Sequence, residues 1–225
     1  MLKIAFAGNP NVGKTALINE IAGSKLKVGN WPGVTVEKKE AQFTYENEEI
    51  FLIDLPGVYS LSPYSNEEII TRDYIINENP DLIINVVDAT NLERNLYLTA
   101  LLKELGKPMI IALNLYDEFK KLDYRLDEKQ FEEFFGLNIV KTSARTREGL
   151  EDLLKKAIAM SKEKEKTNFK LHFNSTIDKE VEAIKKEISD KEEFKSVLEK
   201  LSLDYLAVKL LEEDKHLIDV LKNDY

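Results

Sequence analysis

The chain has 225 residues, of which 43% are hydrophobic and 32% are charged, so we expect a folded protein with a substantial core. A net charge of −9 excludes the basic surface that non-specific nucleic-acid binding needs, and we expect no nucleic-acid partner. The absence of cysteine excludes disulfides and thiolate metal sites, and it predicts a reducing, cytoplasmic environment. No run of about 18 apolar residues occurs, so no segment of this sequence is expected to span a membrane.

Four apolar runs predict buried parallel strands, at residues 2–7, 50–55, 82–89 and 109–114. Stretches with helical periodicity alternate with them, at residues 14–22, 67–77, 91–105, 127–135 and 146–160. Residues 36–55 instead predict a hairpin that turns at residues 46–48 and begins with a polar edge strand. Together these patterns predict an α/β fold with a doubly wound, mostly parallel six-stranded sheet and one antiparallel edge strand.

The character of the sequence changes beyond Met160. Residues 161–170 are strongly charged, as is typical of a linker, and beyond residue 175 apolar residues recur every three or four positions. No strand pattern appears there. We therefore predict two domains, an α/β domain at residues 1–162 and a small all-helical subdomain at residues 163–225.

The first predicted strand runs directly into GNPNVGKT, which matches the phosphate-loop pattern G-x-x-x-x-G-K-[ST]. Its glycines allow a tight turn whose N–H groups face phosphate oxygens, its lysine adds positive charge, and its threonine hydroxyl can bind Mg²⁺. The alternative is a chance glycine-rich turn, but four fixed positions between a strand and a helix favour the phosphate loop. The residues expected to bind phosphate are Gly8, Asn9, Pro10, Asn11, Val12, Gly13, Lys14, Thr15 and Ala16.

Three shorter motifs follow in order. DLPG ends a strand and supplies a carboxylate that can hold Mg²⁺ through water. NLYD ends a later strand, where a carboxylate can accept both N–H donors of guanine, a pair that adenine lacks. Each motif is weak alone, but in this order, with SAR after a short sixth strand, they indicate a P-loop GTPase fold. The residues are Asp54, Leu55, Pro56 and Gly57, then Asn114, Leu115 and Asp117, then Ser143, Ala144 and Arg145.

The loop VGNWPGVTVE contains the only tryptophan of the chain. A GTPase needs a threonine between its first helix and second strand, which closes over Mg²⁺ and the γ-phosphate. Thr35 is the candidate because it lies just before the predicted hairpin strand. The alternative is a solvent-facing threonine at the start of a strand. The loop residues expected to bind nucleotide are Gly33, Val34, Thr35, Val36 and Glu37.

Two positions depart from the general GTPase pattern. Val58 stands where Ras-like enzymes place a water-orienting glutamine, so we expect slow turnover, with the backbone at Gly57 as a candidate for that role. Leu115 replaces the lysine of N-K-x-D, which predicts weaker binding and easier GDP release. The expected catalytic residues are Asn11, Lys14, Thr35 and Gly57.

Three charged residues follow the DLPG motif. Glu67 and Glu68 open a predicted helix, where acidic residues usually stabilise the helix dipole rather than act as a general base. Arg72 is expected to be a surface residue rather than an arginine finger.

The stretches GNPNVGKT, VGNWPGVTVEKKE, DLPGVYSLSPYS, RDYI and NVVDATNLERNLYLT resemble the N-terminal GTPase domain of FeoB, the prokaryotic ferrous-iron transporter family. They cover most of residues 2–99, with looser similarity to residue 154, and NWPGVTVE joined to DLPGVYS is more specific than what small GTPases share. The resemblance implies hydrolysis of GTP to GDP and phosphate. It also implies Mg²⁺ held by Thr15, Thr35 and, through water, Asp54, and K⁺ held by Asn11 and backbone carbonyls around Gly29 and Trp31. The alternative is that Trp31 only packs its loop.

The resemblance further implies a longer membrane protein. The helical tail resembles the subdomain that links the GTPase to the transmembrane iron-transport domain of the same polypeptide. We therefore expect a soluble fragment that belongs at the cytoplasmic face of the prokaryotic inner membrane, with small Feo accessory proteins as candidate partners.

Two other functions remain open. One is a free-standing, potassium-activated assembly GTPase that acts on the ribosome or on tRNA. The acidic charge and the Trp-Pro-Gly loop oppose it. The other is a nucleotide-dependent binding module in which hydrolysis hardly matters, and turnover measured with and without potassium separates it from a GTPase.

Overall fold

A computed structural model of the chain describes residues 1–62, 64–163, 174–198 and 201–223. It divides into two compact units, one of Met1–Lys103 with Lys107–Thr167, and one of Glu104–Gly106 with Asn168–Tyr225. The predicted boundary at residues 162–163 falls at the end of a helix, and most of the predicted linker lies outside the described residues. The two-domain assignment therefore stays a prediction.

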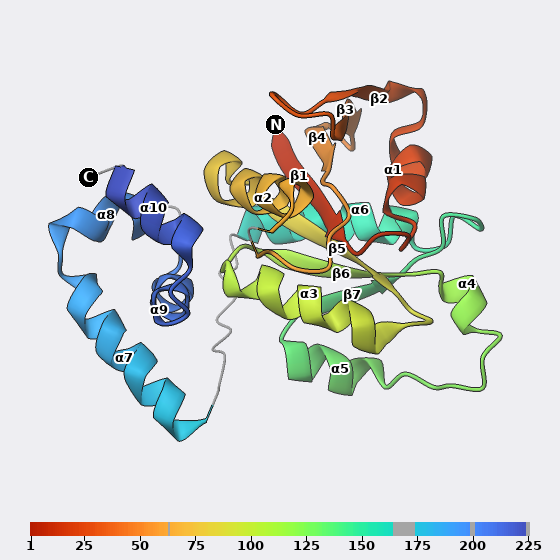
Figure 1. Cartoon of the computed structure of the whole chain (residues 1–225). Coiled ribbons are helices and arrows are strands. Elements are labelled where there is room, and N and C mark those ends of the chain that lie inside the picture. The colour runs from red at the N-terminus through yellow and green to blue at the C-terminus, as the bar shows by residue number, and fades with distance from the viewer. Residues whose placement is uncertain (63, 164–173, 199–200, 224–225) are drawn as a thin grey trace. The chain divides into compact units, whose positions relative to one another are not determined.

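The first unit is built on a seven-stranded sheet with the order β2-β3-β4-β1-β5-β6-β7 (Figure 1). Five of its strands form parallel pairs, and β3 pairs antiparallel with both β2 and β4. The strands are β1 (Leu2–Gly8), β2 (Leu26–Asn30), β3 (Glu37–Tyr45), β4 (Glu48–Asp54), β5 (Leu82–Asp88), β6 (Met109–Asn114) and β7 (Asn138–Lys141). This arrangement confirms the predicted fold class.

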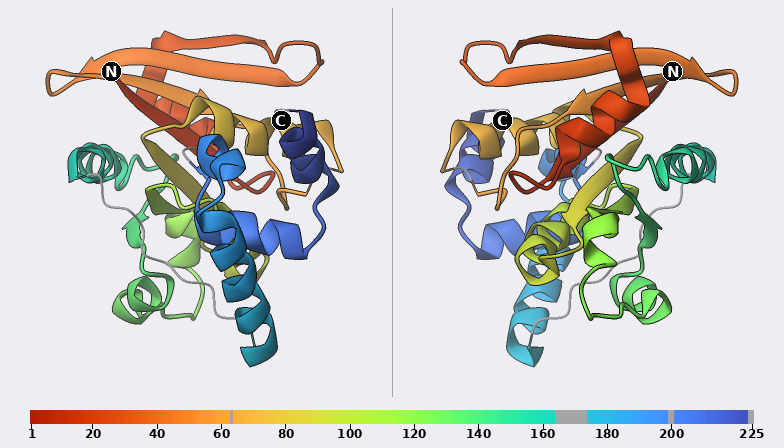
Figure 2. Two further views of the ribbon diagram at one scale, coloured as in Figure 1. Left: turned by 90° about the vertical axis from the view of Figure 1, so that its left-hand side faces the viewer. Right: turned by 90° about the vertical axis from the view of Figure 1, so that its right-hand side faces the viewer.

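The strand that the sequence pattern missed is β2, so the prediction of six strands was one short. Four of its five residues are exposed, which leaves no apolar run to recognise. It forms because it pairs with β3 along one edge of the sheet, from Leu26 opposite Ala41 to Asn30 opposite Glu37. Figure 2 shows this orange ribbon along the sheet edge. The predicted hairpin turn is confirmed, with Glu46 and Asn47 both at positive φ between β3 and β4.

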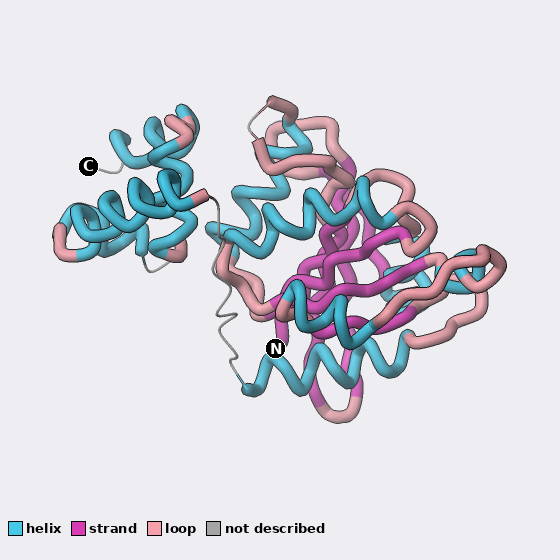
Figure 3. Tube along the Cα trace, turned by 90° about the horizontal axis from the view of Figure 1, so that it is seen from below, coloured by secondary structure: helices cyan, strands magenta, loops and turns pink. Residues whose placement is uncertain are grey.

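Helices cover both faces of the sheet (Figure 3). Ser65 caps α2 and forms a reciprocal capping box with Glu68, so the expected helix-opening role of Glu68 is confirmed. The helix predicted at residues 146–160 begins only at Leu150. Arg147 and Gly149 have left-handed backbone conformations, which an α-helix does not accommodate. The helices are α1 (Lys14–Ala22), α2 (Asn66–Asp73), α3 (Leu92–Glu104), α4 (Tyr116–Phe119), α5 (Glu128–Phe135) and α6 (Leu150–Glu163), with a 3₁₀ turn η1 (Gly23–Lys25) and a π-helical segment η2 (Tyr74–Glu78).

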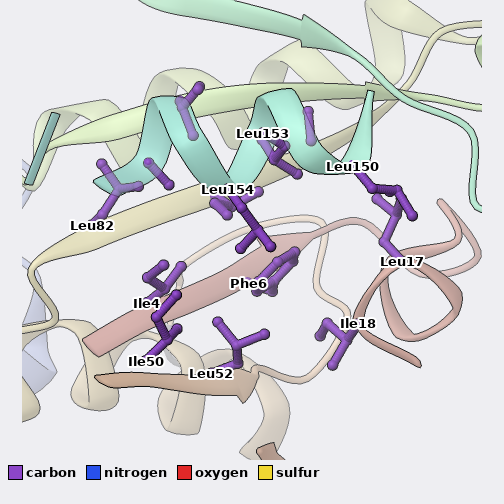
Figure 4. Packing of buried hydrophobic residues seen from close by; sticks show 14 of the residues in the cluster. Ile4, Phe6, Leu17, Ile18, Ile50, Leu52, Leu82, Leu150, Leu153 and Leu154 are labelled. Carbon is purple, nitrogen blue, oxygen red and sulfur yellow. The ribbon is translucent and has the colours of Figure 1, made fainter. Parts of the chain in front are cut away.

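The core on one face of the sheet lies under α1 and α6 (Figure 4). Leu17 of α1 and Leu153 of α6 are fully buried against Ile4 and Phe6 of the central strand β1. Burial of each such side chain contributes roughly 1.5–3 kcal/mol. This packing holds β1 and α1 in fixed positions, and with them the loop that joins the two.

Every helix or strand that the structure describes beyond residue 174 is a helix, in agreement with the predicted periodicity. Val181 of α7 packs on Ala207 and Val208 of α9, with Ile177 and Ile184 beside them. Asn174 and Ser202 cap the two helices through their side-chain oxygens. The elements are α7 (Ser175–Ser189), the 3₁₀ turn η3 (Glu192–Phe194), α8 (Lys195–Leu198), α9 (Leu203–Leu211) and α10 (Lys215–Asn223).

Candidate functional site

The loop between β1 and α1 is shaped by two glycines that no other residue could replace. A Cβ atom on Gly8 would lie 2.5 Å from the carbonyl oxygen of Val86 on the neighbouring strand β5. Gly13 has a φ of 79°, and a Cβ there would lie 2.5 Å from Nδ2 of Asn114. Asn114 in turn donates a hydrogen bond of 2.8 Å to the carbonyl of Val12. The end of β6 therefore holds the phosphate loop in shape.

Three side chains meet at the carboxyl ends of β1 and β4. Lys14 forms an ion pair with Asp54 Oδ1, and Thr15 Oγ1 donates to Asp54 Oδ2 at 2.7 Å. Both members of the ion pair are buried, and an unpaired charge there would be costly because the site is shielded from water. The arrangement places one carboxylate, one hydroxyl and one ammonium group at the opening of the loop.

The DLPG segment packs directly on the phosphate loop. A Cβ on Gly57 would lie 3.0 Å from Cα of Pro10, so the two backbones can approach this closely only with glycine. The N–H of Val58 donates to the carbonyl of Gly8 at 3.2 Å, and the valine side chain is buried. Val58 therefore has a packing role, and its backbone N–H is already engaged.

A cavity of about 390 Å³ opens beside the phosphate loop. Gly13 and Ala16 line one part of it, and Leu115, Asp117 and Ser143 line another. Leu115 has a φ of 58°, which turns the chain sharply at the end of β6 and brings Asp117 into the first turn of α4. The cavity therefore joins the NLYD and SAR motifs to the phosphate loop, as the sequence predicts for a nucleotide base site.

The Asp117 carboxylate is held in its charged form. Its side chain is 11% exposed and forms an ion pair with Arg145, whose Nη2 also lies 2.9 Å from Glu118 Oε1. A hydrogen bond from Ser143, followed by the charge of Arg145, lowers the pKa of Asp117. The Oδ2 atom of Asp117 is buried, and it is the atom that Arg145 Nη2 contacts, although this contact lacks the alignment of a hydrogen bond.

The loop that contains Trp31 closes on itself. The Trp31 N–H donates to the carbonyl of Val36 at 2.9 Å, and Gly33 supplies the positive φ that the turn requires. The indole is only 9% exposed and meets the ring of Tyr74 edge-on, at 5.5 Å between centroids. Burial raises the pKa of Tyr74 to about 12. The packing role considered for Trp31 is thus visible as a contact with η2.

The predicted site residues fall into two groups. Those of the phosphate loop, DLPG, NLYD and SAR lie together at the carboxyl ends of β1, β4, β6 and β7. Residues 29–37 form the end of the β2–β3 hairpin, where Thr35 is exposed. Asn11 is also exposed and has a φ of 66°. The metal ligands assigned to Asn11, Gly29, Trp31 and Thr35 stay predictions.

The expectation for Arg72 was wrong. Its side chain is buried, with the whole residue 2% exposed, and its Nε lies 3.9 Å from Asp73. The expectation rested on its charge alone, although Arg72 lies three residues after Ile69 and therefore on the same side of α2. The packing of this short helix against the rest of the unit buries that side.

Sequence reasoning missed two residues that contact the site. Arg94 accepts a hydrogen bond of 3.2 Å at its backbone carbonyl from Asn9, and its guanidinium lies over the Tyr59 ring at 4.4 Å. Tyr74 packs on Trp31. Both residues lie in stretches that resemble the FeoB family, RDYI and NVVDATNLERNLYLT, but the resemblance gave neither residue a role, and only the three-dimensional packing shows what each one contacts.

Comparison with known proteins places these features in a family. A protein-family model described as ferrous iron transport protein B matches residues 2–157. The Fe(2+) transporter FeoB of Methanocaldococcus jannaschii is 47% identical over 222 residues, which cover 98% of this chain and 32% of that protein. A Fe(2+) transport protein A/Fe(2+) transporter FeoB fusion protein of Porphyromonas gingivalis is 44% identical over 96% of this chain and 26% of its own length. The chain thus spans about a third or less of these relatives.

Solved structures agree over both units. The cytosolic domain of the T. maritima FeoB iron transporter in its GMPPNP form has a TM-score of 0.91 and 38% identity, covering 99% of this chain and 86% of that chain. A GDP form of the same domain has a TM-score of 0.90, with the same identity, over 99% of this chain and 85% of that chain.

Proposed function

The chain belongs to the ferrous iron transport protein B family and has a GTPase fold, and we propose that it binds GTP and GDP and hydrolyses GTP to GDP and phosphate. One observation carries the proposal. The Lys14–Asp54–Thr15 cluster and the cavity containing Asp117 lie at the same edge of the sheet and share the phosphate loop. Phosphate and base groups on one nucleotide would require this combination.

The phosphate loop would hold the β- and γ-phosphates through its backbone N–H groups and Lys14. Mg²⁺ fits the donors present, because Thr15 Oγ1 and Asp54 Oδ2 are hard oxygen ligands that lie 2.7 Å apart. Thr15 would bind the ion directly and Asp54 through water. When bound, Mg²⁺ neutralises charge on the phosphates. Lys14 would exchange its partner Asp54 for a phosphate oxygen as the nucleotide enters.

Hydrolysis requires a group that positions the attacking water. The amide of Val58 is engaged by Gly8, so we assign this role to the backbone at Gly57, with Thr35 closing over the γ-phosphate. Asn11, together with carbonyls near Gly29 and Trp31, would hold K⁺, which offsets negative charge in the transition state. The exposure of Asn11 supports this role, because its side chain lies on the phosphate loop and is accessible to an ion.

The nucleotide site would serve ferrous-iron transport. The relatives named Fe(2+) transporter FeoB are about three times longer than this chain or more, and the matched solved chains are called cytosolic domains. No helix among the described residues is long and apolar enough to cross a bilayer. We assign this chain to the cytoplasmic side of a membrane transporter, where nucleotide state controls a transmembrane domain of the same polypeptide. The relative in which Fe(2+) transport protein A is fused to the transporter supports a protein of that kind as an accessory partner.

A phosphate-release assay tests the proposed activity. Protein with Mg²⁺ and K⁺ is expected to release phosphate from GTP but not from ATP. Lys14→Ala is expected to abolish release, because the remaining side chains supply no positive charge to the outer phosphates. Equal release from GTP and ATP, or full release by the Lys14→Ala protein, would contradict the proposal.

A further inference from the structure

Arg145 is paired with the Asp117 carboxylate, the group that the proposed base recognition needs. Its Nη2 forms an ion pair with Asp117 Oδ2 at the cavity beside the phosphate loop. The amino-pyrimidine edge of guanine is itself a guanidine fragment, with an N–H and an NH₂ group on one carbon. The guanidinium of arginine presents the same pair of donors in one plane. The side chain and the base are therefore chemical analogues that compete for one carboxylate.

The geometry points to Arg145 as an internal competitor for guanine, which must leave Asp117 before the base can bind there. This inference rests on the proposed guanine-nucleotide function and adds the residue that sets its affinity. The hold on Asp117 is weak enough to exchange, because the Arg145 side chain is 62% exposed. In addition, the contact between Arg145 Nη2 and Asp117 Oδ2 is not aligned as a hydrogen bond, whereas guanine can direct one donor to each oxygen of the carboxylate.

Glu118 provides the position to which Arg145 would retreat. Its Oε1 lies 2.9 Å from the same Nη2 atom, and Glu118 lines the cavity next to Asp117. Arg145 can therefore keep one ion pair while it gives up the other. Lys121 also binds Glu118, through Oε2 at 2.7 Å, which leaves Oε1 to the guanidinium. Release of Asp117 by Arg145 therefore costs little free energy, because the guanidinium keeps its ion pair with Glu118.

The test compares the GDP affinities of Arg145→Ala and Arg147→Ala with that of the parent protein. Arg147 is a matched control because it lies in the same loop, is 68% exposed, and pairs with Glu20 at 2.8 Å instead of Asp117. Arg145→Ala is expected to bind GDP about two- to fivefold more tightly, the range for an exposed ion pair of up to about 1 kcal/mol. The affinity of Arg145→Ala for inosine diphosphate should rise by the same factor, because the same competing side chain has been removed. Arg147→Ala should change neither affinity by as much.

Two further variants separate competition from other effects of charge. Glu118→Gln is expected to weaken GDP binding in the parent but not in the Arg145→Ala protein, because it removes the retreat position. Asp117→Asn is expected to bind xanthosine diphosphate, whose carbonyl accepts a hydrogen bond from the amide. In that background Arg145→Ala should have no more effect than Arg147→Ala.

The outcomes are distinct. Weaker GDP binding by Arg145→Ala, or a gain matched by Arg147→Ala, overturns the competitor role and makes Arg145 a ligand or a simple surface charge. A gain that persists in the Asp117→Asn background overturns it as well. If the parent protein binds GDP no better than ADP, the proposed function itself fails, whatever the Arg145 variants do.

Discussion

The Asp117 carboxylate is the group on which the proposed base recognition depends, because it is largely shielded from water and kept ionised by Ser143 and Arg145. A charge in such a position discriminates strongly between bases that can donate hydrogen bonds to it and bases that cannot. A base that cannot donate to it leaves a buried carboxylate unsatisfied, and that costs more than the hydrogen bond itself would contribute. Selection of guanine over adenine thus follows from one side chain and its surroundings.

Asp117→Ala is therefore expected to weaken GTP binding by at least about 2 kcal/mol, the scale for losing a hydrogen-bonded charged partner. A titration with a fluorescent guanine nucleotide measures the change. Asp123→Ala, which removes the same charge from an exposed position in the following loop, serves as the control and should bind as the parent does. An unchanged affinity for Asp117→Ala would refute the assignment of the base site.

Asn11 carries the potassium prediction. An ion beside the phosphates acts mainly on the transition state, so its loss should lower turnover more than nucleotide affinity. Replacing K⁺ by Na⁺ at equal ionic strength is expected to slow phosphate release by roughly tenfold or more, on the order of 1.4 kcal/mol in the barrier. Asn11→Ala should lose the response to K⁺ and keep GDP binding, because Lys14 and Thr15 are untouched. Equal rates in KCl and NaCl for the parent would remove potassium from the mechanism.

Single residues also show what a sequence can and cannot predict. Gly8, Gly13 and Lys14 were identifiable because the phosphate-loop pattern fixes the residue at each of those positions, and the atoms that crowd both glycines show why no side chain fits there. The pairing of Arg145 with Asp117 joins residues from two motifs that meet only in the fold. Arg72 was misplaced for a related reason, since burial depends on what covers a helix and not on its own periodicity.

At the scale of elements, the β2–β3 hairpin and the helical segment after it form one contact across the proposed switch region. Trp31 at the hairpin end touches Tyr74 of η2, and Lys38 of β3 lies 5.5 Å from the centre of the indole ring. The hairpin end was predicted as a loop with Thr35 poised for the γ-phosphate. The sequence could not show where Trp31 packs, because no local pattern connects it to a residue on a distant helix.

Trp31 should report movement of this loop. If Thr35 closes over the γ-phosphate, the loop must shift and the indole must lose part of its contact with Tyr74. The fluorescence of the only tryptophan is then expected to differ between the GDP complex and the complex with a GTP analogue. Tyr74→Leu should reduce that difference and leave GDP affinity unchanged, because Tyr74 does not line the nucleotide cavity. Identical emission in both complexes of the parent would show that the loop is not a nucleotide switch.

At the scale of the whole molecule, the second unit contains a buried carboxyl group with a consequence for stability. Burial raises the pKa of Glu104 to about 7, while Lys209, 3.8 Å away, opposes the shift and Glu212 adds to it. The folded protein therefore binds a proton that the unfolded chain releases between about pH 4.5 and 7. Its stability should decrease as the pH rises through that interval.

Glu104→Gln is expected to remove this part of the pH dependence, because the amide carries no charge at any pH. Chemical unfolding followed at several pH values between 4.5 and 7 measures the effect. Glu93→Gln, on the same helix, is the control variant and should keep the slope of the parent protein. A parent stability that rises across the interval, or a slope that Glu104→Gln leaves unchanged, would contradict the burial argument.

The change from alternating strands and helices to helices alone near residue 175 was foreseeable from the sequence periodicity, whereas the division into two domains at residues 162–163 stays a prediction. The common direction of the parallel strands also agrees with the motifs, which follow several of these strands and must lie at one edge of the sheet to meet one nucleotide. What could not be foreseen was β2, whose residues gain their structure from a neighbouring strand and not from an apolar pattern of their own.

The central claim is that this chain hydrolyses GTP and selects it through Asp117. The most direct test is a phosphate-release assay of the parent protein and of Asp117→Asn, each supplied with GTP and with xanthosine triphosphate in the presence of Mg²⁺ and K⁺. The parent is expected to turn over GTP in clear preference. The variant is expected to reverse that preference, because its amide can donate to the xanthine carbonyl where the carboxylate could not. A variant that still prefers GTP, or a parent that distinguishes neither nucleotide, would contradict the account.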